Sequence, residues 1–332
     1  MKVLITGGAG FIGSRIAKKI NNKYPNWELT ITDKFNNREL RTNGNYKYFG
    51  TYKNLKNIDA KIISGDLHDL DWLKLFLSEN HFDIIYHQGA ISDTTELNEE
   101  LVMRTNYTSF RIIVEHVIKQ KIKLIYASSA ATYGNSATPQ SLNNKYFPEN
   151  IYGYSKLQMD KLTLSLKKSN DYSIVGLRYF NVYGPGEIYK QTTSSMILQL
   201  AYQAIHYKKV RLFEFGEQNR DFIYIDDVIQ ANLNAMSYNG NGVFNVGSGI
   251  SRSFNDIVEI LSENLGTNIK IEYFENPHLF YQNNTCADIN STKENLNFNP
   301  NYGLETGIAD YIKTIKCYTK IDWSYFKKNK DE

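Results

Sequence analysis

Residues 6–14 read TGGAGFIGS, a glycine-rich stretch that follows an apolar run at residues 3–6 and enters an amphipathic segment at residues 11–21. Gly7, Gly10 and Gly13 stand three residues apart. Glycine is needed where a turn takes positive φ and where the backbone approaches a pyrophosphate closely. The N–H groups at the start of the following helix can bind that anion. Because the glycines lie between a predicted strand and a predicted helix, the stretch predicts a dinucleotide-binding turn.

The rhythm of the chain beyond this turn indicates an α/β protein. Strands are predicted at residues 3–6, 28–32, 61–63, 83–87, 123–127 and 173–177, and helices at residues 11–21, 70–78, 101–119 and 152–167. Strands that alternate with helices form a parallel sheet covered on both faces, with ligands at the carboxyl ends of the strands. The pattern predicts a Rossmann-type doubly wound parallel sheet.

The rhythm changes after about residue 180, where Gly184-Pro185-Gly186 interrupts it. Helices are then predicted at residues 192–207, 254–265 and 304–318, and a strand at residues 270–274. Strands at residues 222–225 and 243–246 are expected to return to the large sheet. The sequence therefore predicts a dinucleotide-binding domain at 1–180 plus about 218–247. A smaller interleaved α/β domain for the substrate is predicted at about 181–217 plus 248–332.

The composition excludes several classes of function. The net charge of the 332 residues is +3, too small to suggest a nucleic acid as partner. Cys286 and Cys317 are the two cysteines, and they show neither metal spacing nor a disulfide framework, so no metal site is expected. We see no signal peptide and no apolar run long enough to span a membrane, and we expect a cytoplasmic protein.

The end of the second predicted strand bears on the choice of dinucleotide. Asp33 stands where an acid usually binds the hydroxyls of the adenosine ribose, which favours NAD. Lys34 and Arg38 follow closely and could instead hold the 2′-phosphate of NADP, or could simply be solvated cations. Asp66 is placed either beside the adenine or at a helix cap. The sequence leaves NADP and NAD both open.

The stretch 149–157, ENIYGYSKL, carries the chemistry. Tyr152 and Lys156 are four residues apart and share one helical face, whereas Tyr154 lies about 160° round from Lys156. A tyrosine that acts as a base near neutral pH needs its pKa lowered from about 10, and a lysine and an oxidised nicotinamide can supply that charge. Ser129 ends a predicted strand and can orient the reacting oxygen. This group of residues is typical of hydride transfer at a hydroxyl or ketone.

YASSAATYG at 126–134 and RYFNVYGP at 178–185 make the sequence resemble the extended short-chain dehydrogenase/reductase family, which acts on sugar nucleotides. Other stretches resemble, more closely, the ADP-L-glycero-D-manno-heptose 6-epimerase family. They are HQGAISDTTE at 87–96, IYGYSK at 151–156, GLRYFNVYGP at 176–185, LFEFG at 212–216 and RDFIYIDDV at 220–228. The resemblance covers most of the chain, and it is weakest at residues 40–60 and at both ends.

The resemblance implies an activity and a cofactor. Such an enzyme removes a hydride from carbon 6 of the heptose and returns it to the other face of the ketone, while NADP stays bound, and the product serves the inner core of lipopolysaccharide. It further implies a second base, Lys190, five residues after Pro185. Taken alone, a lysine in a polar loop is usually a solvated charge. This chain has Gly186 where the family usually has arginine.

Residue by residue, the resemblance and the motifs predict three sets. The catalytic set is Tyr152, Lys156, Lys190 and Ser129. The cofactor set is Gly7, Gly10, Phe11, Ile12, Gly13, Asp33, Lys34, Arg38, Lys53, Asp66, Leu67, Gln88, Gly89, Ala90, Ile91, Ser92, Thr105, Tyr152, Lys156, Val182 and Lys190. The substrate set is Ser92, Thr94, Ser129, Asn181, Thr192, Gln199, Phe213, Glu214, Phe215, Gly216, Arg220 and Tyr281.

Three other functions compete with this one. A 4-epimerase or 4-dehydrogenase acting on a GDP- or UDP-sugar needs one tyrosine and no second base. A 4,6-dehydratase needs an acid–base pair where this chain has Ala130 and Ala131, so it is disfavoured. A regulator that has lost catalysis would usually lack the tyrosine or the lysine, and both are present.

The family resemblance also implies a homo-oligomer, a pentamer in related enzymes. Arg220 fits a diphosphate, or an ion pair with Asp221 or Asp227.

Overall fold

The computed structural model describes residues 1–41, 44–167, 169–275 and 284–318. Its centre is a seven-stranded sheet in the order β10-β6-β5-β4-β1-β2-β3, with every neighbouring pair parallel. The strands are β1 (Lys2–Thr6), β2 (Glu28–Asp33), β3 (Lys61–Ser64), β4 (Ile84–His87), β5 (Lys123–Ser129), β6 (Ser173–Tyr179) and β10 (Asn241–Val246). The order reverses between β1 and β4, which is where ligands bind in doubly wound folds. The predicted Rossmann-type sheet is confirmed.

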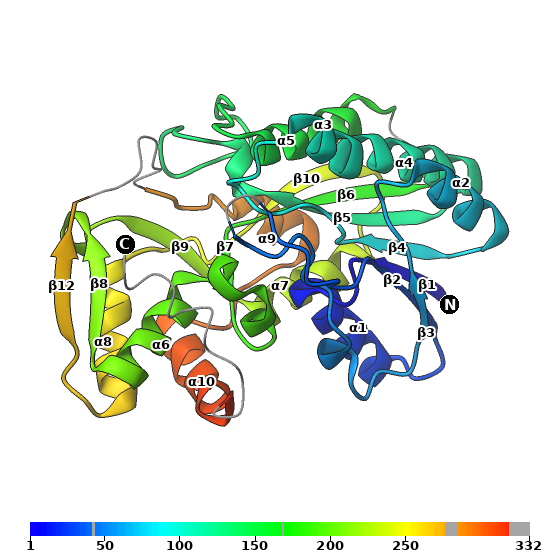
Figure 1. The fold of residues 1–332 in the computed structure, drawn as a ribbon. Helices are drawn as coiled ribbons and strands as arrows, with labels where there is room; N and C mark the ends of the chain where they lie inside the picture. The colour runs from blue at the N-terminus through cyan, green and yellow to red at the C-terminus, as the bar shows by residue number, and fades with distance from the viewer. Residues whose placement is uncertain (42–43, 168, 276–283, 319–332) are drawn as a thin grey trace.

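Helices cover both faces of this sheet (Figure 1). One face carries α2 (Leu70–Glu79), α3 (Glu99–Val102), the π-helical turn η2 (Met103–Thr108), α4 (Ser109–Gln120) and α5 (Ile151–Ser165). The other carries α1 (Phe11–Lys23), α7 (Ile225–Ala235) and α9 (Asn290–Leu296). Alternate residues of a strand face opposite sides, so Val3 and Ile5 join one buried apolar cluster and Leu4 joins the other. Burial on both faces explains the continuous apolar runs of the strands.

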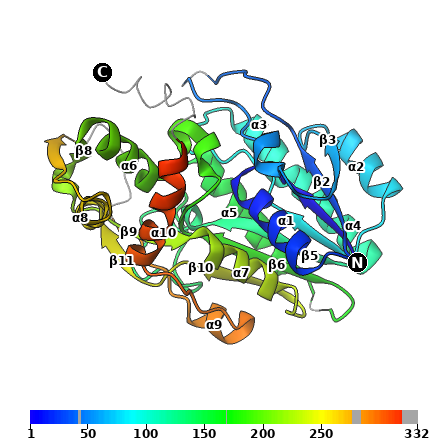
Figure 2. The same cartoon turned by 90° about the horizontal axis from the view of Figure 1, so that it is seen from below.

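A second lobe stands at one end of the sheet (Figures 1 and 2). Its strands are β7 (Asn181–Tyr183), β9 (Asn219–Tyr224) and β11 (Ser251–Ser253) in the order β11-β9-β7, and the separate pair β8 (Lys209–Phe213) and β12 (Lys270–Phe274). Its helices are α6 (Met196–Tyr207), α8 (Phe254–Leu265) and α10 (Leu304–Cys317). Short 3₁₀ turns are η1 (Tyr52–Leu55), η3 (Ala130–Thr132), η4 (Glu187–Thr193) and η5 (Glu214–Gly216). The division of the chain into two domains at the boundaries given above stays a prediction.

Two predictions of local structure are wrong. The strand expected at residues 222–225 is β9, which pairs with β7 and β11 instead of the large sheet. An apolar run predicts a strand but not its partner, because pairing depends on packing far away in the chain. The helix expected from residue 192 begins at Met196, because the Ser195 side chain caps it by accepting a hydrogen bond from the Leu198 amide at 3.3 Å. The residues before it form η4.

Candidate active site

The glycine turn between β1 and α1 has the form that a pyrophosphate needs. Gly7 takes a φ of +65°, and a Cβ there would lie 2.5 Å from the Gly89 amide nitrogen. A Cβ on Gly13 would lie 2.4 Å from the Gly7 carbonyl oxygen. Gly10 caps α1 without a side-chain hydrogen bond, so the first N–H groups of the helix face the pocket uncapped. The turn fits the diphosphate of a dinucleotide.

Asp33 at the end of β2 is turned toward the glycine turn. Its Oδ2 accepts a hydrogen bond from the Ala9 amide at 2.9 Å, and burial raises the pKa of Asp33 to about 6. Lys34 lies 2.5 Å from Asp66 Oδ2 and 4.2 Å from the centre of the Tyr48 ring. Both Lys34 and Asp66 line the same pocket as the glycine turn.

A pocket of about 590 Å³ opens at the carboxyl ends of the strands, between the large sheet and the second lobe. Its volume lies in the range of sites that enclose small molecules. The predicted site residues that line it are Gly7, Gly10, Phe11, Ile12, Gly13, Asp33, Lys34, Asp66, Leu67, Gln88, Gly89, Ala90, Ile91, Ser92, Thr94, Thr105, Ser129, Tyr152, Lys156, Asn181, Val182, Lys190 and Arg220. Residues as far apart in the sequence as Gly7 and Arg220 therefore line one cavity.

The tyrosine and lysine of α5 occupy one side of this pocket. Asn150 caps the helix, which places Tyr152 in its first turn. The Lys156 amine donates a hydrogen bond to the Ala127 carbonyl oxygen at 2.7 Å and lies 5.9 Å from the centre of the Tyr152 ring. Tyr154 is 45% exposed and is absent from the pocket lining among the described residues. The structure thus brings Tyr152, and not Tyr154, to Lys156.

Burial dominates the electrostatics of Tyr152 and Lys156. Burial raises the pKa of Tyr152, and a hydrogen bond with Ser129 opposes that rise. Burial lowers the pKa of Lys156 to about 8, against the opposing charge of Asp160. The causes that shift the pKa of Tyr152 are burial and Ser129, and the Lys156 amine is bound to the Ala127 carbonyl oxygen. Lowering the pKa of Tyr152 therefore needs a positive charge beyond these groups.

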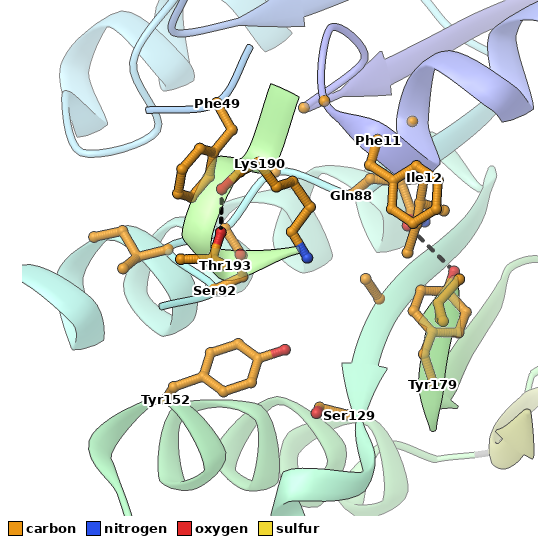
Figure 3. Close-up of a pocket in the computed structure, with 18 of the residues that line it drawn as sticks. Phe11, Ile12, Phe49, Gln88, Ser92, Ser129, Tyr152, Tyr179, Lys190 and Thr193 are labelled. Atoms are coloured by element: carbon orange, nitrogen blue, oxygen red, sulfur yellow. Dashed lines mark hydrogen bonds between the residues drawn. The ribbon is translucent and has the colours of Figure 1, made fainter. Parts of the chain in front are cut away.

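Lys190 lies on the opposite side of the pocket, in η4. Figure 3 shows its amine and the Tyr152 hydroxyl pointing into the same space, with Ser129 beside it. Burial lowers the pKa of Lys190, and the charge of Glu187 opposes that effect. Gly186, where the family usually has arginine, takes a φ of +106°, a conformation that residues with a side chain rarely adopt. An arginine would be strained in this backbone.

Some predicted residues do not reach the pocket in the part of the chain that the structure describes. Arg38 and Lys53 are absent from its lining, and the Lys53 amine lies 5.6 Å from the centre of the Tyr189 ring. Thr192 hydrogen-bonds to Asn45, and Gln199 Nε2 donates to the Thr192 carbonyl at 3.1 Å. Their proposed contacts with ligands stay predictions.

The same holds for the predicted segment 213–216. Phe213 packs against Phe274 with ring centres 5.7 Å apart, and Phe215 is 69% exposed. Gly216 is also absent from the pocket lining among described residues. Tyr281 and the side chain of Glu214 lie outside what the structure describes.

The structure adds pocket residues that no motif indicated. They lie at residues 41 and 47–50 and at the junction of η4 and α6, and include Arg41, Lys47, Tyr48, Phe49, Gly50, Thr193, Ser194, Ser195 and Met196. Arg41 is nearly buried and lies 3.7 Å from Asp93. Residues 193–196 could have been inferred from their closeness to Lys190, but the 41–50 segment carries no sequence signal of its own.

Comparison with known proteins agrees with this geometry. Residues 3–247 match the model of the NAD dependent epimerase/dehydratase family. The chain belongs to this family. Among curated proteins, an ADP-L-glycero-D-manno-heptose-6-epimerase of Brachyspira hyodysenteriae is 36% identical over 326 residues, which are 95% of this chain and 98% of that protein.

Two solved structures show the same fold. The ADP-L-glycero-D-manno-heptose-6-epimerase of Helicobacter pylori is 47% identical, with a TM-score of 0.86, over 95% of this chain and 96% of that one. The UDP-glucose 4-epimerase of Thermotoga maritima is 25% identical, with a TM-score of 0.82, over 96% and 99%. Within the described ranges, no helix has the length and apolar character to cross a membrane, and no cluster of His, Cys, Asp and Glu side chains could hold a metal ion.

Proposed function

We propose that this family member is an ADP-L-glycero-D-manno-heptose 6-epimerase that uses two bases, Tyr152 and Lys190. The observation that carries the proposal is their position: a hydroxyl and an amine point into one space from opposite sides of the pocket (Figure 3). The two similar heptose epimerases support the choice of substrate. The product would serve lipopolysaccharide synthesis, as the family resemblance implies.

The two residues would serve the two faces of carbon 6. A nicotinamide cofactor, if bound at the glycine turn, would supply the acceptor and then the donor of the hydride. One residue takes the proton of the carbon-6 hydroxyl as the ketone forms, and the other donates a proton to the ketone oxygen when the hydride returns to the opposite face. Ser129 orients the oxygen. Burial favours the neutral amine of Lys190, which is the form that accepts a proton.

Lys190→Ala tests the two-base mechanism. We expect a loss of carbon-6 epimerisation of at least about 10²-fold, the usual contribution of a positioned base. Lys161→Ala is the control, since Lys161 is an exposed lysine of the same helix as Tyr152. Full activity of Lys190→Ala on the ADP-heptose would show that the mechanism is wrong.

The cofactor proposed is NADP. Support comes from Lys34 and Lys47, two cations that line the pocket, and from Asp33, whose carboxylate is bound to the Ala9 amide. The cofactor released by heat denaturation of the purified protein can be identified by mass spectrometry. A release of NAD alone would contradict the choice of NADP.

The rival activity is carbon-4 epimerisation or oxidation of a UDP- or GDP-sugar, for which the likeness to a UDP-glucose 4-epimerase is the supporting observation. This reaction needs no second base, so Lys190→Ala would leave it largely intact. Conversion of a UDP-hexose by wild type, with none of the ADP-heptose, would favour it. The homo-oligomer, a pentamer by resemblance, stays a proposal that light scattering can test.

A further inference from the structure

Glu187 is a buried carboxylate, 0% exposed, in the turn that carries Lys190. Its Oε1 accepts hydrogen bonds from the Gly184 amide at 3.2 Å and from the Ser195 hydroxyl at 2.8 Å. Its Oε2 accepts one from the Ser195 amide at 2.7 Å. Gly184 precedes η4 and Ser195 caps α6, so a single side chain joins both ends of the turn that presents the Lys190 amine to the pocket.

The turn needs such a clamp because its backbone is strained next to Lys190. Gln191 has a φ of +54° and a ψ of −126°, a conformation that glycine accepts and side chains rarely adopt. Strain of this kind persists only where the surroundings impose it. Within the turn, the Thr193 hydroxyl donates to the Lys190 carbonyl at 2.8 Å. The ends are held by Glu187.

The charge of Glu187 also acts on the Lys190 amine. Its charge raises the pKa of Lys190, against the larger opposing effect of burial. The other titratable groups near Glu187 are tyrosines from β7 and from α10 and its end: Tyr183, Tyr311 and Tyr318. Burial is the largest cause that raises the pKa of each of these tyrosines, and the charge of Glu187 adds to it. The three tyrosines are therefore neutral at physiological pH. A carboxylate, and not a phenolate, is therefore the anion that acts on the amine.

We propose that Glu187 is a positioning residue for Lys190: through its hydrogen bonds to Gly184 and Ser195 it closes the turn that presents the amine to the pocket, and its carboxylate is the buried anion of that turn. Glu187 touches neither substrate nor cofactor, since it is absent from the described pocket lining. The effect of Glu187 on turnover rests on the proposed role of Lys190 as a base, but the effect of Glu187 on the protonation of the Lys190 amine does not.

The test measures the amine directly. The purified protein, as isolated with its cofactor, is acetylated with acetic anhydride over a range of pH, and the modification of Lys190 is followed by peptide mass spectrometry. In Glu187→Gln the loss of the charge shifts the labelling profile of Lys190 to lower pH and speeds labelling near pH 8. Coincident profiles of this variant and the wild type would overturn the proposal.

Asp227→Asn is the matched control. Asp227 is another buried carboxylate that accepts backbone hydrogen bonds, from Asn301 at 2.8 Å and Tyr302 at 3.1 Å, and it is absent from the described pocket lining. This variant should lose stability without moving the labelling profile of Lys190. A shift as large as that of Glu187→Gln would mean that any buried carboxylate has the effect, and would contradict a specific role.

Ser195→Ala tests the clamp if Glu187→Gln does not fold. It removes the hydrogen bond from the Ser195 hydroxyl to Glu187, together with the cap of α6, and leaves the charge of Glu187 in place. We expect kcat to fall at least about threefold, the effect of losing one ordinary hydrogen bond, while the labelling profile stays unchanged. Unchanged kcat would overturn the clamp. If instead Lys190→Ala kept its epimerase activity, the base would be wrong while the labelling result on Glu187 would stand.

Discussion

Asp160→Asn is the substitution whose cost the structure predicts best. Asp160 lies one turn after Lys156 on α5 and is 1% exposed. It accepts hydrogen bonds from Tyr126 at 2.8 Å, from Ser128 at 2.8 Å and from Arg178 Nε at 2.7 Å. Arg178 is itself fully buried, so Asp160 is the countercharge of a cation inside the protein.

The expected magnitude follows from this burial. Removing one partner of a buried ion pair leaves the other charge uncompensated and costs about 3–5 kcal/mol. The Arg178 guanidinium also lies 4.8 Å from the centre of the Tyr133 ring and 4.6 Å from that of Tyr146, which softens the loss without replacing the carboxylate. At about 2–4 °C per kcal/mol, the melting temperature should fall on the order of 10 °C.

Scanning calorimetry of the variants measures this loss. Asp171→Asn is the control, because Asp171 pairs with Lys121 at 3.0 Å with both side chains at least 60% exposed, and such pairs contribute about 0–1 kcal/mol. The double variant Asp160→Asn/Arg178→Met should recover part of the stability, since it removes the stranded charge. If Asp160→Asn costs no more than Asp171→Asn, the reasoning about the buried pair is refuted.

Three further predictions concern the site. Gly13→Ala should cause loss of the cofactor, because the new Cβ would lie 2.4 Å from a backbone oxygen. Gly303→Ala is the control and should retain the cofactor, because the nearest contact of its Cβ is at 3.4 Å. Mass spectrometry of the purified proteins measures the bound cofactor. Tyr152→Phe should lower kcat at least about 10²-fold and Tyr154→Phe less than about threefold, so equal losses would contradict the assignment. Burial lowers the pKa of His87 from 6.5 to about 3. Below about pH 6.5 the unfolded chain therefore binds a proton that the folded protein excludes, and the stability of the fold is lost as the pH falls toward 3. His87→Gln should flatten the fall of the melting temperature in that range.

The large sheet and the glycine turn could be predicted because their signals are local. The strand, the glycines and the helix of the turn are contiguous, and the helix at residues 254–265 was predicted with its observed bounds. Tyr152 and Lys156 are four residues apart on one helix, so helical geometry alone separates them from Tyr154.

The rest depends on contacts between distant parts of the chain. In the sequence, β9 has the apolar pattern of any buried strand. Its place in the three-stranded sheet, and not in the large one, depends on the packing of the second lobe. Arg41 and Phe49 line the pocket although nothing in the composition of the sequence around them indicates a site. The clamp of Glu187 joins residues on either side of Lys190 through a side chain that looks, in the sequence, like an ordinary charge in a loop.

Incubation of the purified protein, with the cofactor it carries, with ADP-D-glycero-D-manno-heptose tests the central proposal most directly. Proton NMR of the sugar reports the configuration at carbon 6. The account predicts a mixture of the D-glycero and L-glycero forms, reached from either epimer, without net oxidation or reduction of the cofactor. No interconversion in either direction, with the cofactor bound, would contradict it.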